Sequence, residues 1–169
     1  PQAPLRRAWP SNFRCAFPIR GCNREVGVMG DLRSLVDPVS ERVLGACIEV
    51  HRRLGPGLLE ACYEKCVCLE LELRGIRFER QVALPVLYKG LRLEQAYRLD
   101  LLVEDSLVVE IKAVEQLLPV HVSQTLTYLR LGNFPTGLLI NFNQATLKAG
   151  VRRLTPNKSP QGSFPPPSL

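Results

Sequence analysis

The chain has 169 residues, of which 46% are apolar, so it is long enough for one folded domain with a substantial core. No apolar run approaches the roughly 20 residues that a membrane-spanning helix needs, which excludes that class of membrane protein. The net charge of +6 suggests a polyanionic partner, but residues 37–154 carry only fifteen Lys and Arg against fourteen Asp and Glu, so charge alone does not predict nucleic-acid binding.

The two ends of the chain differ in composition from its middle. Residues 1–36 are rich in Arg, Pro and Gly without a sustained period, and they contain the single Met, Met29. We expect natural translation to start at Met29 and residues 1–36 to form a disordered extension, with a short ordered arm as the alternative. Residues 155–169 include three consecutive Pro residues and predict a disordered tail. Residues 37–154 are therefore expected to form the folded domain.

The first predicted helix begins at Asp37 and Pro38. Asp is a good N-cap and Pro suits the first helical position, so this pair is typical of a helix start. Apolar residues then recur at helical spacing as far as Leu54. The Gly-Pro-Gly sequence at 55–57 ends the helix.

A second helix is predicted from Leu58 to Arg74. Gly75 follows it at the position where a left-handed residue is favoured. We expect one side of this helix to face the core, namely the side that carries Leu59, Cys62, Tyr63, Cys66, Leu69 and Leu73.

The sequence period then changes from that of a helix to that of strands. Apolar and polar residues alternate over 82–88, and residues 91–103 continue as extended chain after a turn signal at 89–90. A short polar segment at 104–106 separates this stretch from the β-prone residues 107–112. These segments predict an antiparallel meander.

A third helix is predicted over residues 120–131, followed by an apolar strand at 137–142 and a short strand at 151–154. Helices, then strands, then a helix and another strand predict an α/β fold with a mixed central β-sheet flanked by helices.

The six Cys residues do not form a zinc-binding pattern. The sequence contains no CxxC, and its two His residues, His51 and His121, are isolated. We expect small buried thiols in a reducing compartment, and hence a cytoplasmic protein.

The polar segment at 104–106 has a consequence for two acidic residues. If Asp105 is the centre of an antiparallel hairpin, Asp100 faces Glu110 and Arg98 faces Lys112. Directly opposed side chains lie roughly 5 Å apart at their Cβ atoms. Two carboxylates this close repel each other unless a positive charge lies between them. A register shift of one residue would break this alignment.

Two interpretations of this pair remain open on residue types alone. In the first, Asp100 and Glu110 hold a hard divalent cation such as Mg²⁺, which prefers carboxylate, water and phosphate oxygens. Lys112, on the same face, then stabilises charge or lowers the pKa of an attacking water. In the second, Glu110 pairs with Arg98 and Asp100 with Lys112 on a solvated face of the sheet.

The sequence around these residues resembles the PD-(D/E)XK nuclease superfamily. Asp100 is followed ten residues later by Glu110, Ile111 and Lys112, although Leu99 stands where the eponymous Pro would be. One bacterial family of the superfamily has a GxxExxY signature, which residues 57–63 match. Further agreement lies in 45–51, 54–57, 97–100, 110–114 and 138–142, so the resemblance covers about residues 38–154.

The resemblance implies a restriction-endonuclease-like core and specific roles. Asp100, Glu110 and Glu60 would bind the metal, and Lys112 would position or activate the water. Gln124 would hydrogen-bond the site or the water. Tyr128 and Arg98 are possible substrate-binding residues. Val122 stands where relatives often have Glu, which puts the polar face of the third helix in doubt.

Two further residues have structural predictions. Tyr63 is expected to pack in the core with its hydroxyl near the edge of the cleft. His51 is expected to cap the end of the first helix rather than bind metal.

The function that the resemblance implies is Mg²⁺-dependent hydrolysis of phosphodiester bonds in nucleic acid, with Mn²⁺ as a substitute ion. We expect the substrate to be DNA in preference to RNA. Arg98, Arg80 and Arg130 are candidates for backbone contacts, and a homodimer is possible. The alternative is a nuclease-fold module with little or no activity that binds nucleic acid or a protein partner. A third possibility is hydrolysis of a small nucleotide.

Overall fold

The structure is a computed structural model that describes residues 37–156. The predictions for residues 1–36 and for the tail beyond residue 156 lie outside the described residues. The helices and strands follow in the order α1 (Pro38–Leu54), α2 (Glu60–Leu73), β1 (Phe78–Tyr88), β2 (Leu91–Val103), β3 (Leu107–Lys112), α3 (Pro119–Gly132), β4 (Thr136–Asn141), α4 (Leu147–Gly150) and β5 (Val151–Leu154).

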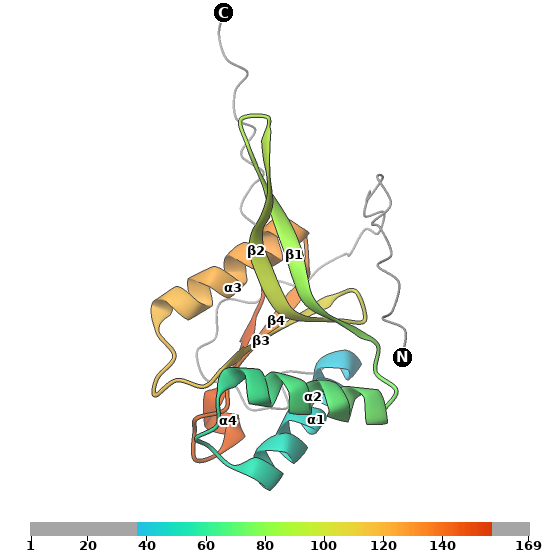
Figure 1. Cartoon of the computed structure of the whole chain (residues 1–169), viewed down its shortest axis with the longest axis vertical. Helices are drawn as coiled ribbons and strands as arrows, with labels where there is room; N and C mark the ends of the chain where they lie inside the picture. The colour runs from blue at the N-terminus through green and yellow to red at the C-terminus, as the bar shows by residue number, and fades with distance from the viewer. Residues whose placement is uncertain (1–36, 157–169) are drawn as a thin grey trace, which may run out of the picture.

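The five strands form one sheet in the order β1-β2-β3-β4-β5. The β3–β4 pair is parallel and the other pairs are antiparallel, because α3 carries the chain back to the start of the sheet between β3 and β4. Helices α1 and α2 lie on one face of the sheet and α3 lies on the other (Figure 1). The predicted α/β fold with a mixed sheet and flanking helices is therefore confirmed.

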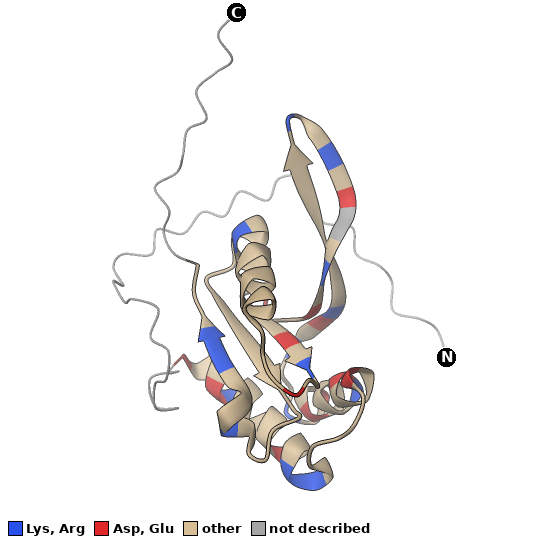
Figure 2. Ribbon diagram, turned by 90° about the vertical axis from the view of Figure 1, so that its left-hand side faces the viewer, with Lys and Arg blue, Asp and Glu red and all other residues tan. Residues whose placement is uncertain are grey.

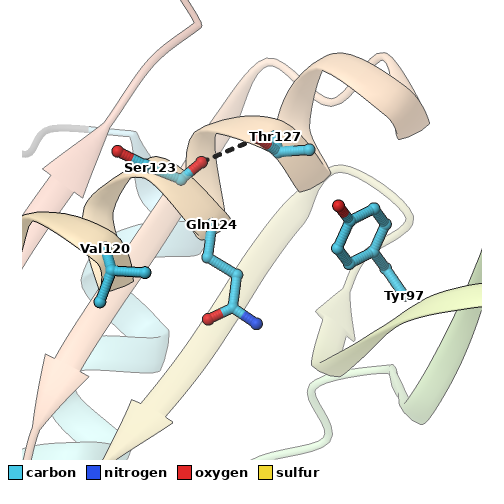
Figure 3. Close-up of a pocket in the computed structure, with 5 residues that line it drawn as sticks. All are labelled: Tyr97, Val120, Ser123, Gln124 and Thr127. Atoms are coloured by element: carbon cyan, nitrogen blue, oxygen red, sulfur yellow. Dashed lines mark hydrogen bonds between the residues drawn. The ribbon is translucent and has the colours of Figure 1, made fainter.

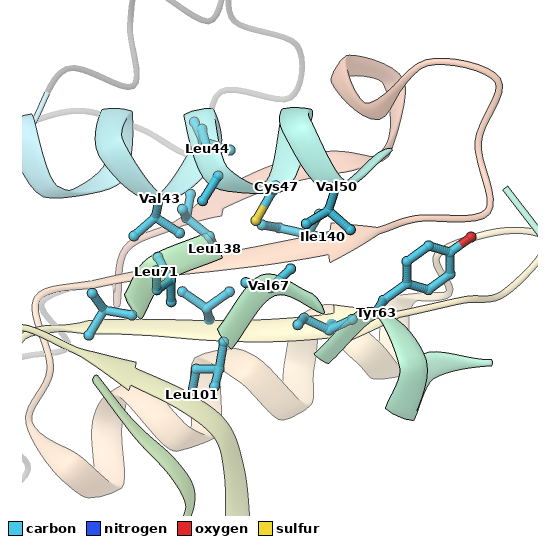
Figure 4. Packing of buried hydrophobic residues seen from close by; sticks show 14 of the residues in the cluster. Val43, Leu44, Cys47, Val50, Tyr63, Val67, Leu71, Leu101, Leu138 and Ile140 are labelled. Atoms are coloured by element: carbon cyan, nitrogen blue, oxygen red, sulfur yellow. The ribbon is translucent and has the colours of Figure 1, made fainter. Parts of the chain in front are cut away.

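Two hydrophobic cores fill the space between the layers. Between the sheet and helices α1 and α2, Val43, Cys47, Val67 and Leu71 pack against Leu101, Leu138 and Ile140 (Figure 4). Between the sheet and α3, the second core contains Val82, Leu84, Leu99, Leu102, Val108, Tyr128, Leu129, Phe134, Leu139 and Leu154. Burial on both faces explains why β3 and β4 are almost continuously apolar.

The start of α1 is as predicted. The Asp37 carboxylate accepts hydrogen bonds from the Ser40 backbone amide at 2.8 Å and from the Ser40 hydroxyl at 2.6 Å. It also accepts one from the Arg153 guanidinium on β5 at 3.0 Å. The cap therefore both starts the helix and ties it to the last strand.

Helix α2 buries only part of the side that was predicted: Tyr63 is fully buried and Cys66 is partly buried against the core. Its buried residues are Tyr63, Val67, Cys68 and Leu71, whereas Leu59, Leu69 and Leu73 are exposed and Cys62 is on the surface. The rest of the prediction was wrong because apolar residues occur all round this helix, so their spacing does not single out one face. The face that packs follows the spacing of 63, 67 and 71 toward the sheet.

Tyr63 packs in the core as predicted, but its hydroxyl is bonded within the turn between α1 and α2 and not at the edge of a cleft. The hydroxyl donates to the Gly55 carbonyl oxygen at 2.6 Å and accepts from the Leu58 amide at 3.2 Å, while the ring stacks on Phe142 with centroids 4.5 Å apart. Tyr63 thus holds the turn between α1 and α2. His51 lies within 2.8 Å of the Gln144 carbonyl oxygen through Nε2, so its ring contacts the segment before α4 instead of capping α1.

The hairpin register predicted for β2 and β3 is confirmed. Leu101 pairs with Val109, Leu102 with Val108 and Val103 with Leu107, and the turn is centred on Asp105. The ladder ends at Leu101, however, and β2 continues alongside β1 alone. Arg98 consequently pairs with Ala83 and not with Lys112, which corrects that part of the prediction.

The regular alternation of side chains between the two faces of the sheet is interrupted in β2 at Asp100. Leu101 and Val103 enter the core under α1 and α2, but Leu99 enters the core under α3, which simple alternation does not allow. The neighbouring strand has an irregularity at the same level, since Gln81 has a φ of 52° between the pairs Arg80–Leu101 and Val82–Leu99. Val82, Leu84 and Leu99 still pack against α3, and the tip of the β1–β2 hairpin beyond the pair Leu84–Tyr97 stands clear of the body of the domain (Figures 1 and 2).

Two further observations complete the fold. Helix α4 was not predicted from the sequence, as four residues are too few to show a period. None of the helices in residues 37–156 is both long and apolar enough to cross a membrane.

Candidate active site

Asp100 on β2 and Glu110 on β3 are held close together by the hairpin register. The Asp100 backbone amide donates to Glu110 Oε1 at 3.3 Å, and the Ile111 amide donates to Asp100 Oδ2 at 2.9 Å. Each carboxylate thus accepts a hydrogen bond from the strand that carries the other. The two acids therefore lie close together, as the sequence predicts.

Lys112, the last residue of β3, places its ammonium among the acids. Its Nζ lies 3.3 Å from Glu110 Oε2 and 4.0 Å from Asp100 Oδ2. Its side chain is 15% exposed, against 4% for Glu110 and 17% for Asp100. The ammonium is therefore the positive charge that lets two neighbouring carboxylates be buried together.

Glu60 is the third acid of the cluster and comes from the first turn of α2. Its Oε1 lies 3.4 Å from Lys112 Nζ, and its side chain is 43% exposed. One turn later, Glu64 accepts hydrogen bonds from Arg80 at 2.9 Å and from Gln81 at 3.0 Å on β1. Glu64 thereby anchors the beginning of α2 beside the strands and positions Glu60 at the site.

Burial raises the pKa of Glu110 to about 7, and the neighbouring Asp100 charge adds to this rise. Burial also raises the pKa of Asp100, against the lowering effect of the Ile111 amide and of Lys112. A carboxyl group with such a pKa binds a proton or a cation readily near neutral pH.

The pKa of Lys112 lies above its ordinary value. Burial alone would lower it, but the negative charges of Glu110, Asp100 and Glu60 outweigh that effect. The side chain is therefore an ammonium at neutral pH, which can stabilise negative charge but cannot accept a proton.

Gln124 and Tyr128 lie on α3 and are linked to each other. Gln124 Nε2 donates to the Tyr128 hydroxyl, and the Tyr128 ring lies 5.4 Å from that of Tyr97 on β2. Burial raises the pKa of Tyr128, and the charge of Glu110 raises it further. Gln124 itself is exposed and contacts Tyr128 rather than a carboxylate.

Tyr97 had no role in the sequence-based prediction. A half-exposed aromatic residue three positions before the candidate metal ligand is the signal that could have identified it. The contact between Tyr97 and Tyr128 depends on α3 folding over β2, and no local sequence pattern reveals that arrangement.

The three candidate arginines differ in their availability. Arg80 is engaged by Glu64 at 2.9 Å. Arg98 is exposed and pairs with no acid in residues 37–156, and Arg130 donates to the Thr127 hydroxyl at 3.2 Å. Lys, Arg, Asp and Glu are interspersed over the described domain (Figure 2), as its near-neutral charge requires.

The donor set fits a hard divalent cation in part. Within the described domain, no three His, Cys, Asp or Glu side chains converge into a complete metal cage. Two buried carboxylates that share one neighbouring cation do suit Mg²⁺, however, because this ion takes one or two carboxylates and fills its remaining positions with water and phosphate oxygens.

Comparison with known proteins agrees with this geometry. No curated protein and no solved structure gave a significant match to the chain. A family model described as the PD-(D/E)XK nuclease superfamily matches residues 37–154, which contain every candidate site residue named above. The chain therefore belongs to the PD-(D/E)XK nuclease superfamily.

Proposed function

We propose that this protein hydrolyses phosphodiester bonds in DNA with the help of a bound Mg²⁺ ion, for which Mn²⁺ can substitute. The observation that carries the proposal is the buried Asp100–Glu110 pair with the Lys112 ammonium beside it. Membership of a nuclease superfamily supports the reaction class, and the choice of DNA and of Mg²⁺ is ours.

Asp100 and Glu110 are the proposed metal ligands, with Glu60 as a third. Two of these carboxylates are held in place by backbone amides, so they are preorganised and do not need to be recruited on binding. The bound ion would supply Lewis-acid charge for a phosphoryl oxygen and lower the pKa of a water.

Lys112 is proposed to stabilise the negative charge that develops on the phosphoryl group during attack. Its ammonium is charged and lies within 4.0 Å of both strand carboxylates, so it is held beside the position where a phosphate would bind. Gln124 is proposed to orient substrate or water through its amide, which already bonds the Tyr128 hydroxyl.

Substrate contacts are proposed for the residues that face the site from the hairpin and from α3. Arg98 has no acidic partner among the described residues, so its guanidinium is available to a phosphate. Tyr128 is a proposed contact through the hydroxyl that Gln124 bonds, and its side chain is 3% exposed. We also retain three expectations as proposals: a place in the GxxExxY family, a cytoplasmic location and a homodimer.

A second candidate function is binding of nucleic acid or protein without cleavage. It is favoured by one observation, namely that the Lys112 ammonium already neutralises the acids at 3.3 and 3.4 Å. A metal ion would have to share or displace these contacts.

Cleavage assays separate the two functions. Purified wild-type protein with Mg²⁺ should nick plasmid DNA, and Asp100→Asn and Glu110→Gln should each lower the rate at least 100-fold. Arg52→Gln serves as a control, since Arg52 is exposed and pairs with Glu49 on α1, outside the site. Equal rates for wild type and Asp100→Asn would refute the assigned role. Cleavage of nucleotides but not of plasmid would instead favour a small phosphoester substrate.

A further inference from the structure

A surface pocket of about 370 Å³ lies between α3 and the base of the β1–β2 hairpin. Five residues line it, with Tyr97 facing from β2 and the remaining four on α3: Val120, Ser123, Gln124 and Thr127 (Figure 3). Its volume is in the range of small-ligand sites. The fold and the reaction proposed above do not account for it.

The lining of this pocket suits a flat, uncharged ligand that forms hydrogen bonds. None of the five side chains carries a charge, so the pocket itself offers no cation to a phosphate. Tyr97 offers an aromatic ring that is 37% exposed, and Val120 offers an apolar wall that is 60% exposed. The Ser123 hydroxyl and the Gln124 amide can both donate and accept, whereas the Thr127 hydroxyl already donates to the Ser123 carbonyl oxygen at 2.9 Å. A nucleobase has this combination of a π-face and a polar edge.

The pocket lies beside the strand that carries Asp100. Tyr97, which lines the pocket, stands three residues before Asp100 on β2. The Tyr128 ring lies 5.4 Å from that of Tyr97, and the Tyr128 hydroxyl accepts a hydrogen bond from Gln124. A ligand in the pocket is therefore roughly 10 Å along the strand from a proposed metal ligand.

A cation borders the pocket beside Thr127. Arg130 donates to the Thr127 hydroxyl at 3.2 Å, and it has no acidic partner in the described part of the chain. A polynucleotide that places a base in the neutral pocket could therefore place a backbone phosphate beside Arg130.

We propose that this pocket binds one unpaired nucleobase of a single-stranded segment, next to the phosphate that a metal ion at Asp100 and Glu110 would hold. Tyr97 stacks on the base, and Gln124 contacts its edge. Because a paired base is already stacked on both faces within a duplex, the site selects single strands, overhangs or frayed ends over intact duplex. The inference rests on the proposed function for its neighbouring phosphate, and it adds the class of substrate.

Equilibrium binding of labelled oligonucleotides by the full chain tests the proposal. Fluorescence anisotropy compares a single-stranded DNA with the duplex of the same sequence, with Ca²⁺ in place of Mg²⁺ so that the carboxylates keep a hard cation. Tyr97→Ala should weaken single-strand binding about 5- to 150-fold and leave duplex binding unchanged. Tyr97→Phe should retain binding. Tyr88→Ala is the matched control, because Tyr88 is 61% exposed on the same hairpin but lies outside the pocket.

A second measurement varies the DNA and compares wild type with Tyr97→Ala. One abasic position is moved along the single strand, and wild-type binding should weaken at one position only, while Tyr97→Ala should be insensitive to that position. Equal loss for Tyr97→Ala and Tyr88→Ala, equal loss on single strand and duplex, or no measurable binding by wild type would each overturn the proposal. Mg²⁺-dependent cleavage that is unaffected by Tyr97→Ala would refute the role of the pocket and leave the nuclease function standing. Tyr97-dependent binding without any cleavage would instead refute the nuclease function.

Discussion

The Asp100 amide donates to a side-chain oxygen of Glu110 at 3.3 Å, so the backbone of one strand holds a carboxylate of the next. Glu110 is nevertheless placed in an environment that disfavours its charge, since its side chain is only 4% exposed and burial raises its pKa to about 7. The site therefore stores an electrostatic cost that a bound cation would relieve.

Replacement of Glu110 by Gln should stabilise the protein at neutral and alkaline pH in EDTA. Because the folded-state pKa is about 7 and the ordinary value is 4.5, the folded protein retains a proton in this window that the unfolded chain has lost, so wild-type stability falls as pH rises. The stability advantage of Glu110→Gln should grow by about 3 kcal/mol between pH 4.5 and 8. Urea unfolding at several pH values measures it. Glu79→Gln, at an exposed position on β1, should show no such growth, and a flat profile for Glu110→Gln would contradict the account.

Metal affinity should depend on the same ionisation. Below pH 7 a cation must displace a proton from Glu110, so the affinity for Mn²⁺ should fall about tenfold per pH unit and level off above pH 7. Calorimetric titration between pH 5.5 and 8.5 tests this. An affinity that is independent of pH, or one that persists in Glu110→Gln, would exclude Glu110 as a ligand.

Replacement of Lys112 by Met should destabilise the protein without metal and make it more responsive to metal. The change leaves Glu110 and Asp100 buried without their neighbouring cation, at a cost of about 3 kcal/mol at pH 8. Addition of Mn²⁺ should then raise the melting temperature more in Lys112→Met than in wild type, although DNA cleavage stays at least 100-fold lower. If Mn²⁺ stabilises the two proteins equally, the ammonium and the ion do not share the carboxylates.

The contacts of the candidate site that lie within one hairpin could be predicted from the sequence. The turn centred on Asp105 sets the register of the hairpin, and this register brings Asp100 next to Glu110 one position beyond the last ladder pair, Leu101–Val109. Arg98 was misplaced because the β2–β3 ladder ends at Leu101, where β2 continues with β1 alone. The point at which a long strand leaves its neighbour depends on packing across the sheet, which the sequence of the hairpin does not contain.

Contacts between distant elements could be predicted only in part. The resemblance to a nuclease family pointed to Glu60. Its contact with Lys112 joins helix α2 to strand β3, which are far apart in the sequence. The buried face of α2 was predicted wrongly in part, since Leu59, Leu69 and Leu73 are as apolar as the residues that pack. The ring contact between Tyr97 and Tyr128 requires the placement of α3 over β2, so neither segment alone predicts it.

Removal of the Tyr63 hydroxyl tests the unexpected role of this residue in the fold. The hydroxyl is the only atom that Tyr63→Phe removes, and it bonds the Gly55 carbonyl at 2.6 Å and the Leu58 amide at 3.2 Å. The ring should keep its stacking on Phe142, so the loss should be about 1–2 kcal/mol. Urea unfolding measures this loss, with the exposed Tyr88→Phe as the control expected to cost less than about 0.5 kcal/mol.

Because Glu60 begins the helix that this turn precedes, Tyr63→Phe should also lower DNA cleavage several-fold at temperatures where the protein remains folded. Unchanged stability together with reduced cleavage would mean that the hydroxyl acts at the site instead of in the turn.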